Sequence, residues 1–220
     1  MAAIMAFPRV KPTRQTGVTL IELLFASLIG LITIATIGSV FLSAQKLAIQ
    51  RGKQLLVSEN LSIAVLQIKE DIQRAGFNQL EQSSARLSGA LSVVEIGANS
   101  SLVGYVYRVN PSGAESFRNV VFKREASLNN HQGDGLKICE KYSAHPLTLS
   151  MASLSGPGGY CYQMFNPLQI SVSRFTLQSE SIEGESASSQ MVKIVLAGHL
   201  VTDSDVAYQA EATTLVRNWQ

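Results

Sequence analysis

Residues 18–42 read VTLIELLFASLIGLITIATIGSVFL, a run of 25 residues in which Glu22 is the one charged side chain. As an α-helix, this run is about 37 Å long, which is enough to cross a bilayer. The alternative is a conventional signal peptide, whose apolar core has about 7–15 residues before a small-residue cleavage site. Because the run is longer than that and Leu42 is bulky where such a site needs a small residue, we predict a transmembrane helix.

Glu22 is the residue of this run that needs an explanation. A carboxylate in hydrocarbon costs about 2.5–3.5 kcal/mol on insertion scales, so an acid at this depth is treated as functional. The alternative without a functional role is that the Glu22 side chain reaches the membrane interface close to the helix end, at little cost in free energy. The residues of the run alone leave both interpretations open.

The charges on either side of the run are basic. Met1 to Gly17 contains no acid, and its three cations contribute to a net charge of +2, so the chain without this leader has a net charge of −1. A nearly neutral protein of this kind argues against nucleic acid as a partner. Three cations precede the run and three follow it closely, so the positive-inside comparison does not decide the orientation; they are Arg9, Lys11 and Arg14, then Lys46, Arg51 and Lys53.

Two cysteines, Cys139 and Cys161, lie in the C-terminal part of the chain. An even and sparse count suggests one disulfide in a domain outside the cytoplasm, where it would contribute roughly 3 kcal/mol in the chain-entropy model. The alternative is a pair of buried free thiols. A zinc site is not indicated, because neither cysteine has a second cysteine or a histidine at ligand spacing.

Helical periodicity continues from Ser43 to Phe77, and Gly76 is a plausible C-terminal stop. An apolar stripe in this segment predicts that it packs on the C-terminal domain, with a free coiled-coil dimer as the alternative. The stripe consists of Leu61, Val65, Ile68, Ile72 and Ala75.

The composition after residue 80 indicates a β-rich domain. Short alternating runs predict strands, and the missing βαβ rhythm predicts a mainly antiparallel sheet, with a bulge near Arg174. The fold class is therefore α+β, with a long N-terminal helix packed on the sheet. Strands are predicted at 103–109, 117–123, 136–141, 160–165 and 170–177 and in two further runs after 190, and loops at 110–115, 129–135, 153–159 and 180–189.

Arg14 to Leu24, RQTGVTLIELL, resembles the class III signal of type IV pilins and type II secretion pseudopilins. In that family a prepilin peptidase cuts after the glycine and methylates the new N-terminus. The resemblance implies that Gly17 precedes the cut, that Val18 becomes the first residue, and that Glu22 is the family's fifth-position glutamate. The chain departs from the family's pattern in having valine at the first mature position, and Ser39 where major pilins often have a proline.

This resemblance favours a charge-pairing role for Glu22. Cleavage after Gly17 creates an α-amine on Val18, and the amine of a neighbouring subunit shifted along a helix bundle could meet the Glu22 carboxylate. Such pairing neutralises two buried charges at once and selects subunits in the correct register.

Asp71 to Phe77, DIQRAGF, is similar to the helix end of PilW-type minor pilins, the prepilin peptidase-dependent protein B group, and of the related J-type pseudopilins. The end of the chain, residues 213–219, resembles their closing strand more weakly. The segments implied are a cleaved leader at 1–17, a transmembrane helix at 18–42, an amphipathic continuation at 43–77, and a periplasmic β-rich domain at 78–220.

The resemblance implies a minor type IV pilin, a structural subunit that helps to prime pilus assembly after processing. The expected partners are prepilin peptidase, other minor pilins, the major pilin, the inner-membrane assembly platform and membrane lipid. The expected location is the bacterial inner membrane, with one membrane pass and the C-terminal domain in the periplasm, and then the pilus, or fimbrium. The alternatives are a J-type pseudopilin and, in another class, a membrane-anchored periplasmic enzyme or binding protein.

No motif in the sequence indicates catalysis, so we expect no enzyme activity, no cofactor and no metal. The glycine-rich stretch at 155–159 lacks the ending of a phosphate-binding loop, and a turn is the better interpretation. His131, His145 and His199 share no ligand spacing, and Asp203 and Asp205 lack further calcium ligands. An adhesin-like role for the predicted loop at 180–189 is compatible with a pilin.

Overall fold

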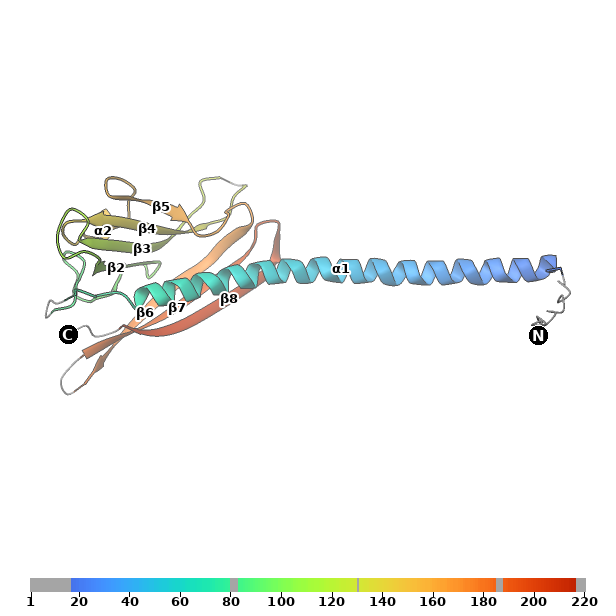
Figure 1. Ribbon diagram of the computed structural model, residues 1–220, viewed down its shortest axis with the longest axis horizontal. Helices are drawn as coiled ribbons and strands as arrows, with labels where there is room; N and C mark the ends of the chain where they lie inside the picture. The colour runs from blue at the N-terminus through green and yellow to red at the C-terminus, as the bar shows by residue number, and fades with distance from the viewer. Residues whose placement is uncertain (1–16, 80–82, 130, 185–187, 217–220) are drawn as a thin grey trace, which may run out of the picture. The chain divides into compact units, whose positions relative to one another are not determined.

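The computed structural model describes residues 17–79, 83–129, 131–184 and 188–216. Its contacts divide the chain into two compact units, one ending at Ile49 and one beginning at Gln50 (Figure 1). Helix α1, Leu20–Ile72, contributes residues to both units. In the first unit α1 has almost only exposed side chains, most of them large and apolar. The predicted boundaries at residues 42 and 77 come from hydropathy and sequence pattern, and they stay predictions.

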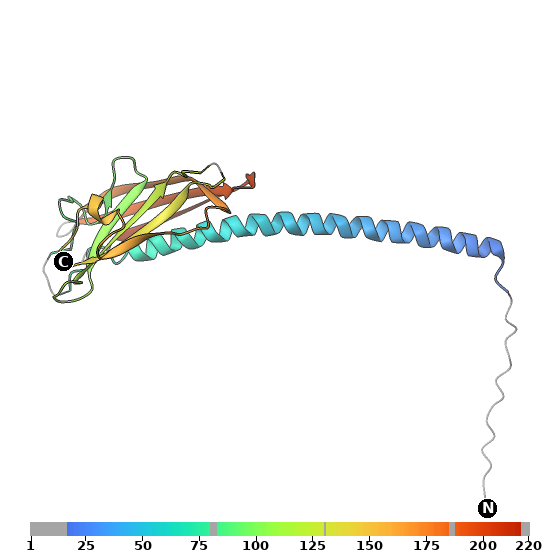
Figure 2. The same cartoon turned by 90° about the horizontal axis from the view of Figure 1, so that it is seen from above.

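The second unit is built from antiparallel strands and a short helix. Its elements are β1 (Glu95–Ile96), β2 (Leu102–Arg108), β3 (Phe117–Glu125), β4 (Gly135–Ser143), α2 (Leu149–Ala152), β5 (Gly159–Gln163), β6 (Ile170–Glu183), β7 (Ser188–Leu200) and β8 (Asp203–Val216). They form a five-stranded sheet, in the order β1-β2-β3-β4-β5, and a three-stranded sheet, in the order β6-β7-β8. The view from above in Figure 2 shows the strands of the larger sheet crossing over those of the smaller one. The predicted α+β class and antiparallel pairing are confirmed, but the strands form two sheets and not one.

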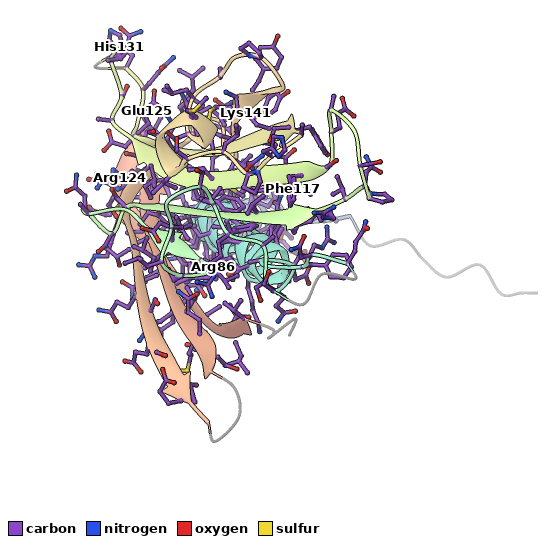
Figure 3. The ribbon with its side chains drawn as sticks, turned by 90° about the vertical axis from the view of Figure 1, so that its left-hand side faces the viewer. Arg86, Phe117, Arg124, Glu125, His131 and Lys141 are labelled. Atoms are coloured by element: carbon purple, nitrogen blue, oxygen red, sulfur yellow. A yellow bond between two sulfur atoms is a disulfide. The ribbon has the colours of Figure 1, made fainter. Side chains whose placement is uncertain are left out.

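The C-terminal part of α1 fills the space between the two sheets. The end view in Figure 3 shows the helix between the five-stranded sheet and the three-stranded sheet. The predicted apolar stripe from Leu61 to Ala75 is fully or almost fully buried, and Val57 extends it by one turn. Burying a large apolar side chain contributes about 1.5–3 kcal/mol. The stripe therefore packs on the domain, and the alternative of a free coiled-coil dimer is wrong.

The end of α1 is fixed by its connection to β2. Gly76 has a φ of +81°, a left-handed conformation in which glycine is not strained. Its N–H donates to the carbonyl of Val106 at 3.0 Å, and Arg108 N–H donates to the carbonyl of Phe77 at 2.7 Å. The predicted stop at Gly76 is confirmed, because the chain turns there and runs along β2.

A buried carboxylate joins the end of α1 to the five-stranded sheet. Asp71 accepts a 2.5 Å hydrogen bond from the hydroxyl of Tyr105, and Arg118 Nη1 lies 3.9 Å from Asp71 Oδ1. Arg118 also donates hydrogen bonds to the Tyr107 hydroxyl and the Glu140 carboxylate. We call these five residues the Asp71 cluster. They come from α1, β2, β3 and β4, so the cluster holds the helix at one position on the sheet.

The environment of the cluster determines its ionisation. Burial raises the pKa of Tyr105 well above its ordinary value of 10, and the negative charge of Asp71 raises it further. Burial and Asp71 also raise the pKa of Tyr107. Burial by itself would lower the pKa of Arg118, but Tyr107, Glu140 and Asp71 together raise it above its ordinary value. Both hydroxyls are therefore neutral and the guanidinium is charged across the physiological pH range.

The strand predictions hold apart from one region. The bulge predicted near Arg174 is confirmed by a register shift in the β6–β7 pairing between Val172 and Arg174. The loop predicted at 180–189 is wrong, since β6 continues to Glu183 and β7 begins at Ser188. The described side chains at 180–184 are all exposed. This hairpin therefore forms by backbone pairing while its side chains stay exposed. Its sequence has no alternation of buried and exposed positions that could indicate strands.

Replacing Asp71 with alanine removes the acceptor of the Tyr105 hydroxyl and a counter-charge of Arg118. We expect Asp71→Ala to lower the free energy of unfolding by about 3–5 kcal/mol, as for other broken buried pairs. Glu70→Ala changes an exposed neighbour on the same helix, and its effect should stay within about 0.5 kcal/mol. Urea titration of the detergent-solubilised full chain measures both, and equal stabilities for the two variants would contradict the role of the cluster.

The raised pKa of Tyr105 predicts a loss of stability in alkali. Above pH 10 the unfolded chain releases this proton while the folded chain keeps it, so stability falls as the pH rises toward the folded-state pKa. Each such proton contributes a slope of about 1.4 kcal/mol per pH unit. Tyr105→Phe should show a shallower fall between pH 9 and pH 11 in urea titrations, whereas Ile68→Val, a core change without a titrating group, should keep the parent slope. A parent-like slope for Tyr105→Phe would show that this tyrosine is not the source.

Candidate functional site

The predicted cleavage point lies outside the helix. Gly17, Val18 and Thr19 are exposed and non-helical, and α1 begins at Leu20. Nothing lies within 4 Å of the position that a Cβ on Gly17 would occupy. An exposed peptide bond outside a helix is accessible to a peptidase. The assignment of Gly17 and Val18 to processing stays a prediction.

Thr19 caps the N-terminus of α1. Its hydroxyl accepts a hydrogen bond from Glu22 N–H at 3.4 Å, and its carbonyl accepts one from Leu23 N–H at 3.2 Å. Threonine followed by glutamate three residues later is the capping-box pattern, and an acid in the first turn is favoured by the helix dipole. This role of Thr19 was not predicted, although the Thr-x-x-Glu spacing before an apolar run is a signal for it.

The apolar part of α1 satisfies its own polar side chains. Ser27, Thr33, Thr36, Ser39 and Ser43 each donate a hydroxyl hydrogen bond to a carbonyl three or four residues earlier, at 2.8–2.9 Å. An 18-residue window of α1 has a mean hydropathy of 2.3, and by length and composition the helix can cross a membrane. These hydroxyls therefore need no partner in hydrocarbon.

Glu22 differs from those hydroxyls because its carboxylate carries a charge. The side chain is exposed on the first turn of α1, and among the described residues no cation forms an ion pair with it. The cap uses the backbone N–H of Glu22 and leaves the carboxylate available. In hydrocarbon such a carboxylate is costly unless it gains a counter-charge or reaches the interface. Its pairing role stays a prediction.

The cysteines form the predicted disulfide. Cys139 on β4 and Cys161 on β5 are register partners and are bonded to each other, so the alternative of two free thiols is wrong. Ala152 of α2 packs in the same small apolar cluster as Cys139. The disulfide joins the edge strand β5 to the sheet, and it fits a domain in an oxidising compartment.

The residues that were considered for metal or phosphate binding have structural roles in the second unit. Asp203 pairs with Lys53 of α1 at 2.9 Å, and Gly156 and Gly159 bridge to each other in the turn that leads into β5. No three histidine, cysteine, aspartate or glutamate side chains in the described ranges are grouped so that they could hold a metal ion. The structure thus brings none of the three histidines into such a group.

Comparison with known proteins gives one match. The family model described as prepilin peptidase-dependent protein B matches residues 50–216, which is more than half of the chain. The matched range coincides with the second unit almost throughout, and it excludes Gly17, Val18 and Glu22. No curated protein and no solved structure matches the chain. The match to the second unit and the resemblance of the processing signal thus rest on separate residues, and the chain belongs to the prepilin peptidase-dependent protein B family.

Proposed function

We propose that this protein is a minor type IV pilin, a structural and non-enzymatic subunit that helps to prime pilus assembly after prepilin peptidase removes residues 1–17. The observation that carries the proposal is the single carboxylate of Glu22 at the start of an exposed apolar helix, five residues after an exposed glycine outside the helix. The family match to residues 50–216 supports a pilin-associated role independently of those residues.

The proposed mechanism depends on charge pairing in a low-dielectric environment. Cleavage gives Val18 an α-amine, which methylation leaves basic. In a bundle of apolar helices, the Glu22 carboxylate accepts the amine of a neighbouring subunit, so that neither charge is buried alone. Each pair fixes the axial offset between two helices, because a different offset leaves both charges without partners. The neighbours are other minor pilins and the major pilin, brought together at the inner-membrane assembly platform.

The location follows from the same argument. The apolar half of α1 crosses the inner membrane once, and the second unit lies in the periplasm until the subunit enters a pilus. The disulfide between Cys139 and Cys161 supports this side of the membrane, because structural disulfides persist in oxidising compartments. A J-type pseudopilin would have the same anchor, and co-purification with type II secretion subunits instead of pilins would favour that alternative.

Processing gives a direct test. Expressed together with a prepilin peptidase, the chain should lose Met1–Gly17 and gain one methyl group on Val18, as measured by intact-mass spectrometry. The same chain expressed without the peptidase is the control and should keep its leader. An unchanged mass in the presence of an active peptidase would contradict the proposal.

Three variants separate the charge of Glu22 from its place in the helix cap. Glu22→Gln keeps a capping-box residue but loses the charge, Glu22→Ala loses both, and Thr19→Ala removes the capping hydroxyl at a cost of about 0.5–2 kcal/mol in helix stability. If pairing drives assembly, both Glu22 variants should lose co-purification with other pilins, and Thr19→Ala should retain it. A normal Glu22→Gln variant beside a defective Thr19→Ala variant would assign the effect to capping.

A further inference from the structure

Strand β8 forms one margin of the three-stranded sheet and leaves its outer edge open. It has 14 residues, Asp203–Val216, and it pairs with β7 (Figure 1). In the described ranges, no backbone group of β8 is hydrogen-bonded outside that pairing. Proteins usually shorten or cover such an edge, or place proline or lysine on it, and β8 contains neither residue.

Two other strand edges of the second unit are used within the chain. On β6, the N–H of Leu177 donates to the carbonyl of Ser100 at 3.0 Å. On β5, Gly156 and Gly159 exchange backbone hydrogen bonds at 2.9 and 3.1 Å. β8 differs from both strands because it offers a long row of unpaired donors and acceptors.

The pairing shows which residues of β8 face the open edge. Successive residues of an antiparallel strand direct their backbone groups to opposite neighbours. Leu177 directs its N–H away from β7, so its register partner Ile194 directs its own backbone groups toward Ala212 of β8. The residues of β8 that alternate with Ala212 therefore direct their N–H and C=O groups outward; they include Ala207, Gln209, Glu211 and Thr213.

A groove runs between β8 and α1 beside this open edge. Two adjoining hollows of about 400 and 380 Å³ share Tyr208, and no residue of β7 lines either of them. On the helix side, Leu55 and Leu66 are 56% and 52% exposed. Three alanines of β8 line the opposite wall; they are Ala207, Ala210 and Ala212. A strand added to β8 would place every second side chain over this groove.

The charged side chains of β8 are all acidic. Asp205 is exposed, and the Glu211 carboxylate lies 3.5 Å from Lys193 of β7. Both acids alternate with the buried Ala210, so they lie on the sheet face away from α1. Opposite charges on neighbouring strands stabilise a sheet, and like charges destabilise it. A strand with lysine or arginine on that face therefore fits the edge, whereas β8 of a second copy would place acid beside acid.

We propose that β8 is a strand-addition site, at which an extended segment of a partner protein pairs with the open edge. The segment that fits has apolar side chains over the groove and basic side chains on the opposite face. Backbone hydrogen bonds supply affinity in this mode, and the alternating side chains supply specificity. The site lies within residues 50–216, so this inference does not depend on cleavage after Gly17 or on the pairing of Glu22.

Peptide binding to the full chain in a neutral maltoside detergent tests the proposal. The probe is a fluorescent ten-residue peptide that alternates valine and lysine, and fluorescence anisotropy measures its binding. N-methyl groups on two lysines or on two valines block opposite edges of this peptide, so one of the two modified peptides should lose binding and the other should keep it. A peptide that alternates valine and glutamate should bind at least about fivefold more weakly.

A proline at position 209 tests the same edge from the protein side. Gln209→Pro removes an outward N–H that has no partner in the sheet, which an edge strand tolerates. The variant should bind the valine-lysine peptide at least about fivefold more weakly than Gln209→Ala, because a backbone hydrogen bond is lost and the ring faces the incoming strand. Circular dichroism checks that both variants are folded, and the N-methyl peptides need no change in the protein.

Two outcomes would overturn the proposal. Equal binding of the two N-methylated peptides would show attraction to the surface or to the micelle without pairing at an edge. Dimerisation of the peptide-free chain that Gln209→Pro abolishes would show that a second copy occupies the edge. Neither result would bear on the leader removal that tests the proposed function.

Discussion

Burial of one apolar stripe of α1 between two sheets is the constraint on which the second unit depends. Val57 to Ala75 supplies the centre of the main apolar cluster, and inward residues of both sheets close around it. Removing the helix would expose the inner faces of both sheets at once. The Asp71 cluster then favours one rotation and one height for the helix, because a buried carboxylate is costly when it loses its hydrogen-bond partners.

The two halves of α1 have different requirements. The half in the second unit buries its stripe and ends in a polar contact, so it is satisfied within the chain. The half in the first unit keeps its apolar side chains exposed, and its serine and threonine hydroxyls bond to its own backbone. Glu22 is the group there that local structure leaves charged. Lipid accommodates the apolar side chains, and the proposed pairing with the amine of a neighbouring subunit would give this carboxylate a counter-charge.

The sequence predicts the parts of this fold that depend on local periodicity. The stripe from Leu61 to Ala75 repeats at helical spacing, and Gly76 is where glycine can turn the chain, so both could be read in advance. In the sequence, Asp71 stands out only as part of the segment that resembles PilW-type minor pilins. Its partner Tyr105 is 34 residues away, and its burial depends on how β2 and β3 pack over the helix. The polar and glycine-containing run at 180–189 predicted a loop, because backbone pairing in an exposed hairpin leaves no burial pattern. The division into two sheets depends on contacts between distant segments, which single-segment patterns do not encode.

The sequence likewise predicts only part of the candidate site. Gly17, Val18 and Glu22 stand out by type and order, whereas the cap formed by Thr19 needed backbone geometry. The most direct test of the account is zero-length carbodiimide cross-linking of membranes that contain assembling pili, followed by mass spectrometry of the helix N-termini. The account predicts an amide bond between the Glu22 carboxylate of this chain and the N-terminal amine of another subunit. A Glu22 carboxylate that is activated by the reagent yet found only hydrolysed, in pili that contain the protein, would contradict it.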